Sequence, residues 1–216
     1  MTSRYLIPIF FLEKYLKWSD KLFLWLDYDS EISLDIVSDI ELVAAKAKPY
    51  DILLITVDAD SPPDPKDVMH TFSRYIPPNL TGLKIKRNFP GTLNGIMTSA
   101  THNGLNMRTN RLSFFQLFNM TYKDSSWMYT WGGIFCDKSD IRKFQNQLDG
   151  LRYIKHDQSI EIIDCPLLTP KEKMYLDSRV IDERIRNPGR TGIIQEQVDR
   201  YALYYKYYPQ FFESIY

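Results

Sequence analysis

Two aspartates and a histidine form the group of residues in this chain that is best suited to chemistry. Asp58 and Asp60 follow an unbroken apolar run, Ile52 to Val57, and His70 comes twelve residues after Asp58. Such a run is typical of a strand buried on both faces. Because side chains alternate along an extended strand, the two carboxylates share a face if the strand continues. The sequence therefore indicates a small polar site at a strand end.

Other interpretations of these residues stay open. Asp beside proline commonly accepts backbone N–H bonds in a turn, and a lone histidine such as His70 is more often structural than a ligand. Asp58, Asp60 and His70 are metal ligands by type, but three ligands from one short segment, without a pattern of residues that would orient them, are weak evidence, so no metal site is predicted. Because the sequence has neither a nucleophile elbow nor a phosphate-cradling glycine loop, it does not predict an enzyme, and no cofactor is expected.

The composition limits the class of protein. A chain of 216 residues fits one domain, and 27 Lys+Arg against 27 Asp+Glu give zero net charge, which argues against general nucleic-acid binding. Cys136 and Cys165 lack the close spacing of a metal or redox pair, so reduced thiols and a cytoplasmic location are expected. The apolar run from Tyr5 to Leu12 is too short to cross a bilayer, so no transmembrane segment is predicted.

The pattern around these residues predicts more strands than helices. The expected strands are Lys21–Tyr28, Ile52–Val57, Thr71–Ile76, Arg111–Tyr122, Trp127–Phe135 and Ser159–Cys165. Helices are expected within Asp137–Leu151, with Ser139 as cap, within Thr169–Arg186, and in the tyrosine-rich tail from Gln195 to Tyr216. Residues 79–108 are turn-rich and predict an ordered functional loop or several short pieces, and Ile40–Ala45 fits either a strand or a helical turn.

The order of these motifs resembles the phosphatidylethanolamine-binding protein family, which includes the Raf kinase inhibitor proteins. In that family a buried strand ends in Asp-Pro-Asp-x-Pro, and a histidine leads the next strand. Here the matching residues are Asp58-Ala59-Asp60-Ser61-Pro62, then His70 and Ile76-Pro77. Asn110-Arg111 lies where the family has His-Arg. The chain departs from the pattern at Ala59, Asn110 and Leu112, which replace a proline, a histidine and an aromatic residue.

The resemblance implies a mainly β fold with a few helices, built on a β-sandwich-like central antiparallel sheet with a C-terminal helix. It implies one domain over residues 1–216, with an N-terminal arm of about residues 1–20 and an insertion at about 152–190. It also implies a phosphate or anion pocket for a phosphorylated small molecule or phospho-headgroup. The residues expected to bind this ligand are Asp58, Asp60, Pro62, His70, Asn110 and Arg111.

The function expected from this resemblance is that of a non-enzymatic binding or regulatory module with a degenerate pocket and a protein partner. Asn110 brings no charge to phosphate, so the pocket is expected to bind more weakly than one with two histidines. The alternative is a structural subunit of a larger macromolecular assembly in which the pocket is vestigial. A third, weaker option is a hydrolase that uses the carboxylates.

Overall fold

The structure of this chain is a computed structural model that describes residues 12, 14, 16–60, 64–76, 80–123, 126–151, 153–157, 159–164, 168–180 and 195–204, the side chains of 178–180 excepted. The chain divides into two compact units, Met1–Ile162 and Ile163–Tyr216. Most of the predicted N-terminal arm and part of the predicted insertion lie outside the described residues. The division into a single domain with these two additions stays a prediction. In the part of the chain that is described, no helix is both long and apolar enough to cross a membrane.

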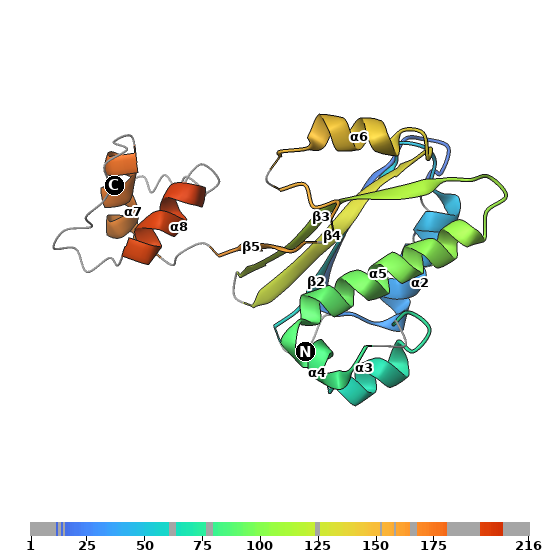
Figure 1. The fold of residues 1–216 in the computed structure, drawn as a ribbon, viewed down its shortest axis with the longest axis horizontal. Coiled ribbons are helices and arrows are strands. Elements are labelled where there is room, and N and C mark those ends of the chain that lie inside the picture. The colour runs from blue at the N-terminus through green and yellow to red at the C-terminus, as the bar shows by residue number, and fades with distance from the viewer. Residues whose placement is uncertain are drawn as a thin grey trace. The chain divides into compact units, whose positions relative to one another are not determined.

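A mixed five-stranded sheet is the centre of the fold (Figure 1). Its strand order is β1-β2-β4-β3-β5, with β1 parallel to β2 and with β4 antiparallel to both β2 and β3. Helix α2 (Leu34–Lys46) connects the two parallel strands, so β1, α2 and β2 make a Rossmann-like βαβ unit. The strands are β1 (Phe23–Glu31), β2 (Ile52–Asp58), β3 (Ser113–Lys123), β4 (Trp127–Cys136) and β5 (Glu161–Ile163).

Helices α2 and α5 (Phe89–Asn106) cover one face of the sheet (Figure 1). The strand register places Leu26, Ile55 and Trp131 side by side on this face, and all three are buried. α2 begins at Ser33, whose side chain accepts a bond from the Ile36 N–H at 3.3 Å. The core therefore lies between the sheet and this helix pair. Its other fully buried members include Ile36, Val37, Ile40, Leu53, Val57, Leu93, Ile96, Met97, Ala100, Tyr129 and Phe135.

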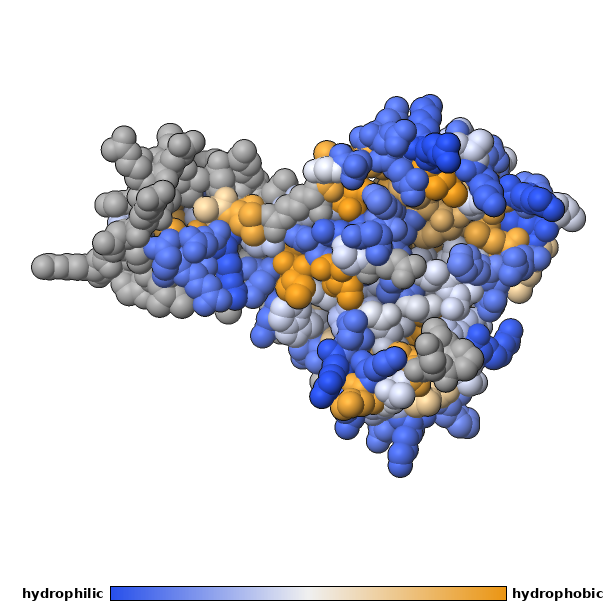
Figure 2. Space-filling view, in the orientation of Figure 1, coloured by the Kyte–Doolittle hydropathy of each residue, from blue (hydrophilic) through white to orange (hydrophobic). Residues whose placement is uncertain are grey.

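Helix α6 (Ile141–Leu148) lies on the opposite face of the sheet from α2 and α5 (Figure 1). Phe144 of α6 stacks on Phe115 of β3 with ring centroids 5.9 Å apart, and Cys136 is buried in the same cluster. Burial raises the pKa of the Cys136 thiol to about 11. The outer side of α6 is mostly hydrophilic, and hydrophobic atoms show between it and the sheet (Figure 2). α6 thus covers the β3–β4 part of this face.

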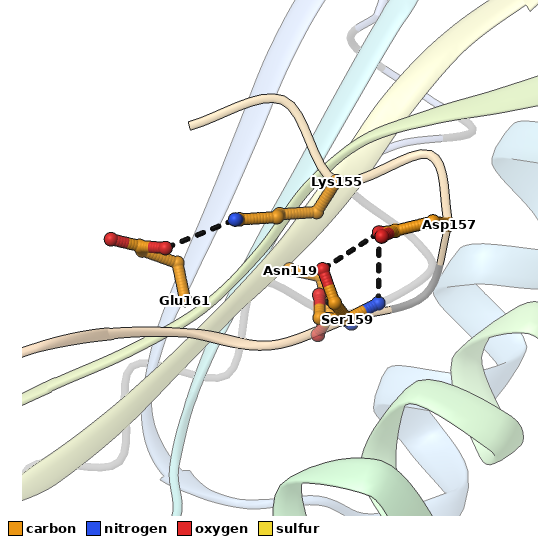
Figure 3. A network of polar contacts seen from close by, with 5 residues as sticks. All are labelled: Asn119, Lys155, Asp157, Ser159 and Glu161. Atoms are coloured by element: carbon orange, nitrogen blue, oxygen red, sulfur yellow. Dashed lines mark hydrogen bonds and ion pairs between the residues drawn. The ribbon is translucent and has the colours of Figure 1, made fainter. Parts of the chain in front are cut away.

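The segment before β5 is fastened to β3 by polar contacts (Figure 3). Asn119 of β3 donates from its amide to the Ser159 carbonyl at 3.0 Å. Asp157 accepts from the Ser159 N–H at 3.0 Å and from its hydroxyl at 2.7 Å, and these bonds lower the pKa of Asp157. Lys155 pairs with Glu161 at 3.0 Å. Together these contacts fix the start of β5 beside β3.

The second unit is built on the helices α7 (Pro170–Val180) and α8 (Gln195–Tyr204). Leu176, Val198 and Tyr201 form its small buried core. Both helices lie within segments that the sequence predicts as helical. Thr169 and Glu172 form a capping box at the start of α7. The side chain of each residue accepts a hydrogen bond from the backbone N–H of the other.

The prediction of a mainly β fold is wrong, because the sheet is mixed and helices cover both of its faces. Two segments account for most of the error. Residues 79–108, expected as an ordered loop or several short pieces, contain α4 (Gly82–Arg87) and the long helix α5. Thr71–Ile76 is expected as a strand, but Thr71 is the last residue of α3 (Pro65–Thr71), and the residues after it form turns. α3 begins at Pro65, because Asp64 caps the helix and proline fits the first helical position.

Candidate functional site

The carboxyl ends of β1 and β2 meet at one edge of the sheet. The register pairs Glu31, the last residue of β1, with Asp58, the last residue of β2. Open α/β sheets bind their ligands outside the carboxyl ends of parallel strands, where side chains of successive loops converge. Trp127 begins β4 at this same edge, beside Asp58. This edge is therefore the candidate functional site, and it contains the two aspartates that the sequence singles out.

Asp58 and Asp60 each hold the chain that leaves β2. Asp58 is half-buried, and its Oδ1 accepts a bond from the Asp60 N–H at 2.8 Å. Asp60 is exposed, and its Oδ1 lies 3.4 Å from the Trp127 backbone nitrogen, which donates to it. The turn-capping interpretation is thus correct for one oxygen of Asp58, whereas Asp60 accepts its bond from the first residue of β4. Within the described residues, nothing bonds to Oδ2 of Asp58, so that oxygen is free to accept a bond from a ligand.

β1 adds further carboxylates to this edge. Asp27 and Asp29 are exposed near the end of β1, and Glu31 ends it. Partial burial and the neighbouring Asp29 raise the pKa of the Asp27 carboxyl. Carboxylates accept bonds from hydroxyl and ammonium groups and attract positive charge, so the edge suits a hydroxylated or cationic ligand. An anion would meet repulsion here.

Trp25 lies on the same strand, two residues before Asp27. Its indole N–H donates to the Thr56 hydroxyl at 3.0 Å, and Thr56 is in turn 2.9 Å from the Thr130 hydroxyl. Thr56 is fully buried although it lies on the face of the sheet opposite to α2. These bonds fix the indole in one orientation against the sheet.

The other residues predicted to bind a ligand are spread over the structure. His70 is exposed in the last turn of α3, and no described residue bonds to its imidazole. Asn110 and Arg111 are exposed just before β3, whose first residue pairs with Cys136 at the far end of β4. β2 separates the two edges by roughly 20 Å at about 3.3 Å per residue. The structure therefore does not bring Asn110 and Arg111 to Asp58.

Pro62 lies outside the described residues. The ligand-binding roles of the six predicted residues stay predictions. Asp58 and Asp60 lie together at the carboxyl end of β2, and Asn110 and Arg111 lie at the opposite edge of the sheet. Within the described part of the chain, His, Cys, Asp and Glu side chains form no group of three or more that is suited to a metal ion.

β1 contributes to this site carboxylates that are not predicted from the sequence. Asp27, Asp29 and Glu31 occupy every second position at the end of β1, much as Asp58 and Asp60 do at the end of β2. Both strands thus have apolar residues followed by carboxylates at alternate positions, and this shared pattern could have indicated that β1 contributes to the site. Strand pairing, which makes the two patterns one site, is not visible in a single sequence.

A family model matches residues 10–216 of the chain, and the family is described as “Putative O-methyltransferase”. No curated protein matches the chain. The match overturns the predicted membership of the phosphatidylethanolamine-binding protein family. It also overturns the non-enzymatic binding or regulatory module and the anion pocket, because the family's description is that of an enzyme. Since the match covers nearly all of its length, the chain belongs to this O-methyltransferase family.

Proposed function

We propose that this protein transfers a methyl group to a hydroxyl oxygen and that it binds the methyl donor at the carboxyl ends of β1 and β2. The donor implied by the family is S-adenosylmethionine. When bound, this cofactor supplies a methyl group from a sulfonium sulfur, which keeps the electron pair of the broken bond while the acceptor oxygen gains the methyl and loses its proton. The observation that carries the proposal is the half-buried Asp58 opposite Glu31 at this edge.

The residues at the edge fit the chemical groups of such a donor. In nucleotide-binding βαβ units, an acidic residue near the end of the second strand accepts bonds from the ribose hydroxyls. Asp58 occupies that position in β1-α2-β2, and its Oδ2 makes no bond to a described residue. Glu31 and Asp60 place further negative charge near a site that would receive an ammonium and a sulfonium cation. We assign the ribose contact to Asp58.

One feature of phosphate-binding units is absent from this connection. Ile32 and Ser33, which join β1 to α2, include no glycine, and the Ser33 side chain caps the helix. A glycine-rich turn at this place lets the backbone approach a pyrophosphate closely. S-adenosylmethionine has no pyrophosphate, so the lack of that turn agrees with the proposed donor and not with a dinucleotide.

Calorimetric titration of the full chain with S-adenosylmethionine tests this assignment. Asp58→Asn keeps the size of the side chain and removes its charge. We expect about a 10- to 100-fold loss of affinity, since hydrogen bonds to charged groups contribute about 1.5–3 kcal/mol. The matched control is Asp64→Asn, because Asp64 lies on the same connection and caps α3 through a bond that asparagine also makes.

Equal affinities in the two variants and in the wild type would show that Asp58 does not hold the donor. Failure of the folded wild type to bind S-adenosylmethionine at all would contradict the proposed function itself. The predicted protein partner remains a separate proposal, and it is addressed by neither result.

A further inference from the structure

The ring of Trp25 is presented to solvent in a fixed orientation. Trp25 is 56% exposed and its neighbour on the same face, Phe23, is 65% exposed. The indole N–H is already bonded to Thr56, so the ring offers a ligand its faces and not a hydrogen bond. A tryptophan face is the best aromatic surface for a cation. The contact offered here is therefore apolar and attractive to positive charge.

The other described tryptophans do not offer such a face. Lys46 lies over the ring of Trp18 at 5.4 Å, and Lys123 lies over the ring of Trp127 at 5.9 Å. Trp131 is fully buried and stacks on Phe114. Among the residues that the structure describes, no lysine or arginine lies over the Trp25 ring. Two of the described indoles thus already contact a lysine of the protein, whereas the exposed Trp25 ring has no such contact with a described residue.

The surroundings of Trp25 provide an apolar floor and a charge. The register pairs Trp25 with the half-buried Leu54 of β2 and pairs Asp27 with Thr56. Asp27 lies two residues beyond Trp25, on the same face of β1, and it is exposed. A flat molecule lying on Trp25 and Leu54 would therefore have a carboxylate at one end, in the direction of Asp58 and the proposed donor site.

We propose that the surface formed by Phe23, Trp25, Leu54 and Asp27 binds the methyl acceptor, and that the acceptor is a flat aromatic amine that carries a hydroxyl group. This inference rests on the proposed function, which requires an acceptor near the donor. The aromatic body packs on the leucine, and the ammonium lies against the indole face. The hydroxyl at the other end of the molecule donates to Asp27, in the direction of the proposed donor site. Charge complementarity selects a cation, because every charged side chain that β1 presents beside Trp25 on this face is acidic.

Calorimetric titration of the full chain with tyramine, without a methyl donor, tests the inference. We expect tyramine to bind about tenfold more tightly than p-cresol, which has the same phenol and no ammonium. Trp25→Leu should weaken tyramine binding about tenfold, and Trp25→Phe should weaken it less because a ring remains. Asp27→Asn should weaken the binding of tyramine and of p-cresol by a similar factor, because both ligands donate their hydroxyl to this carboxylate. The matched control is Trp18→Leu, since Lys46 already lies over that ring, and it should leave the affinity unchanged.

The same preparations are titrated with S-adenosylmethionine, which separates the two proposals, and a thermal melt confirms that each variant is folded. Donor binding without tyramine binding would overturn the inference about the acceptor and leave the proposed function standing. Tyramine binding that is equal in wild type and Trp25→Leu would also overturn the inference, because the ligand would then lie elsewhere. If the folded wild type does not bind S-adenosylmethionine, the proposed function itself is overturned.

Discussion

One buried carboxylate is not explained by the proposed site. Asp39 of α2 is 2% exposed, and its Oδ2 accepts a bond from the Tyr28 hydroxyl at 2.7 Å. Its Oδ1 is buried without a hydrogen-bond partner in the described residues. Burial raises the pKa of Asp39 to about 6, with a further increase from Asp35, while the bond from Tyr28 lowers it. Burial, together with the bond to Asp39, also raises the pKa of Tyr28.

The raised pKa of Asp39 makes stability depend on pH in a defined direction. The folded protein holds the Asp39 proton more tightly than an unfolded chain, in which the pKa is 3.8. The contribution of this proton to the free energy of unfolding is therefore full below pH 3.8 and is lost as the pH rises through 6. The loss is about 2 to 3 kcal/mol. The Asp39→Asn variant has no group that titrates at this position. Between pH 4 and pH 8 the wild type should therefore lose about 2 to 3 kcal/mol of its free energy of unfolding that the variant does not lose. Urea unfolding at the two pH values measures this, and an unchanged difference would show that Asp39 is ionised throughout.

At the scale of elements, the contact between α2 and α5 depends on one glycine. A Cβ at Gly104 would lie 2.3 Å from the Glu41 carbonyl oxygen and 2.7 Å from the Ala44 Cβ. Gly104→Ala should therefore lower the free energy of unfolding by about 1–3 kcal/mol through overpacking. Gly95→Ala is the matched control on the same helix, since nothing lies within 4 Å of its added Cβ. It should stabilise the protein by about 0.5–1 kcal/mol through helix propensity.

Thermal or urea unfolding of both alanine variants gives the comparison. Similar effects at the two positions would mean that α2 and α5 do not approach each other as closely as the structure has them.

The elements that sequence patterns predict well are those whose pattern is local. β2, β3 and β4 fall where buried or alternating apolar residues place them. Within β4, Gly132 lets β2 approach closely, because a Cβ at this position would lie 2.2 Å from the Leu53 carbonyl oxygen. The expected helix around α6 is also confirmed, but Ser139 is not its cap, which is Asp140. α5 was missed because its internal glycines, asparagines and threonines have low helix propensity. Packing of Leu93, Ile96 and Ala100 against the core overrides that propensity.

At the scale of the whole molecule, the fold class depended on those missed helices. Without α5, the chain between β2 and β3 reads as loop and strand, and the sheet then looks antiparallel and mainly β. The carboxylates at the end of β2 were found from sequence because a strand end is a local feature. Their neighbours on β1 were not, since the parallel pairing through α2 joins residues that are far apart in the chain.

Hydrogen exchange of the full chain with and without saturating S-adenosylmethionine tests most directly whether the carboxyl edge of β1 and β2 is the donor site. We expect slower exchange in peptides that contain residues 29–36 and 58–60, because the donor covers the backbone at these strand ends. We expect no change in peptides that contain residues 49–51 or 108–112, at the opposite edge of the sheet. Protection at the opposite edge with none at residues 58–60 would show that the donor does not bind at the carboxyl ends of β1 and β2.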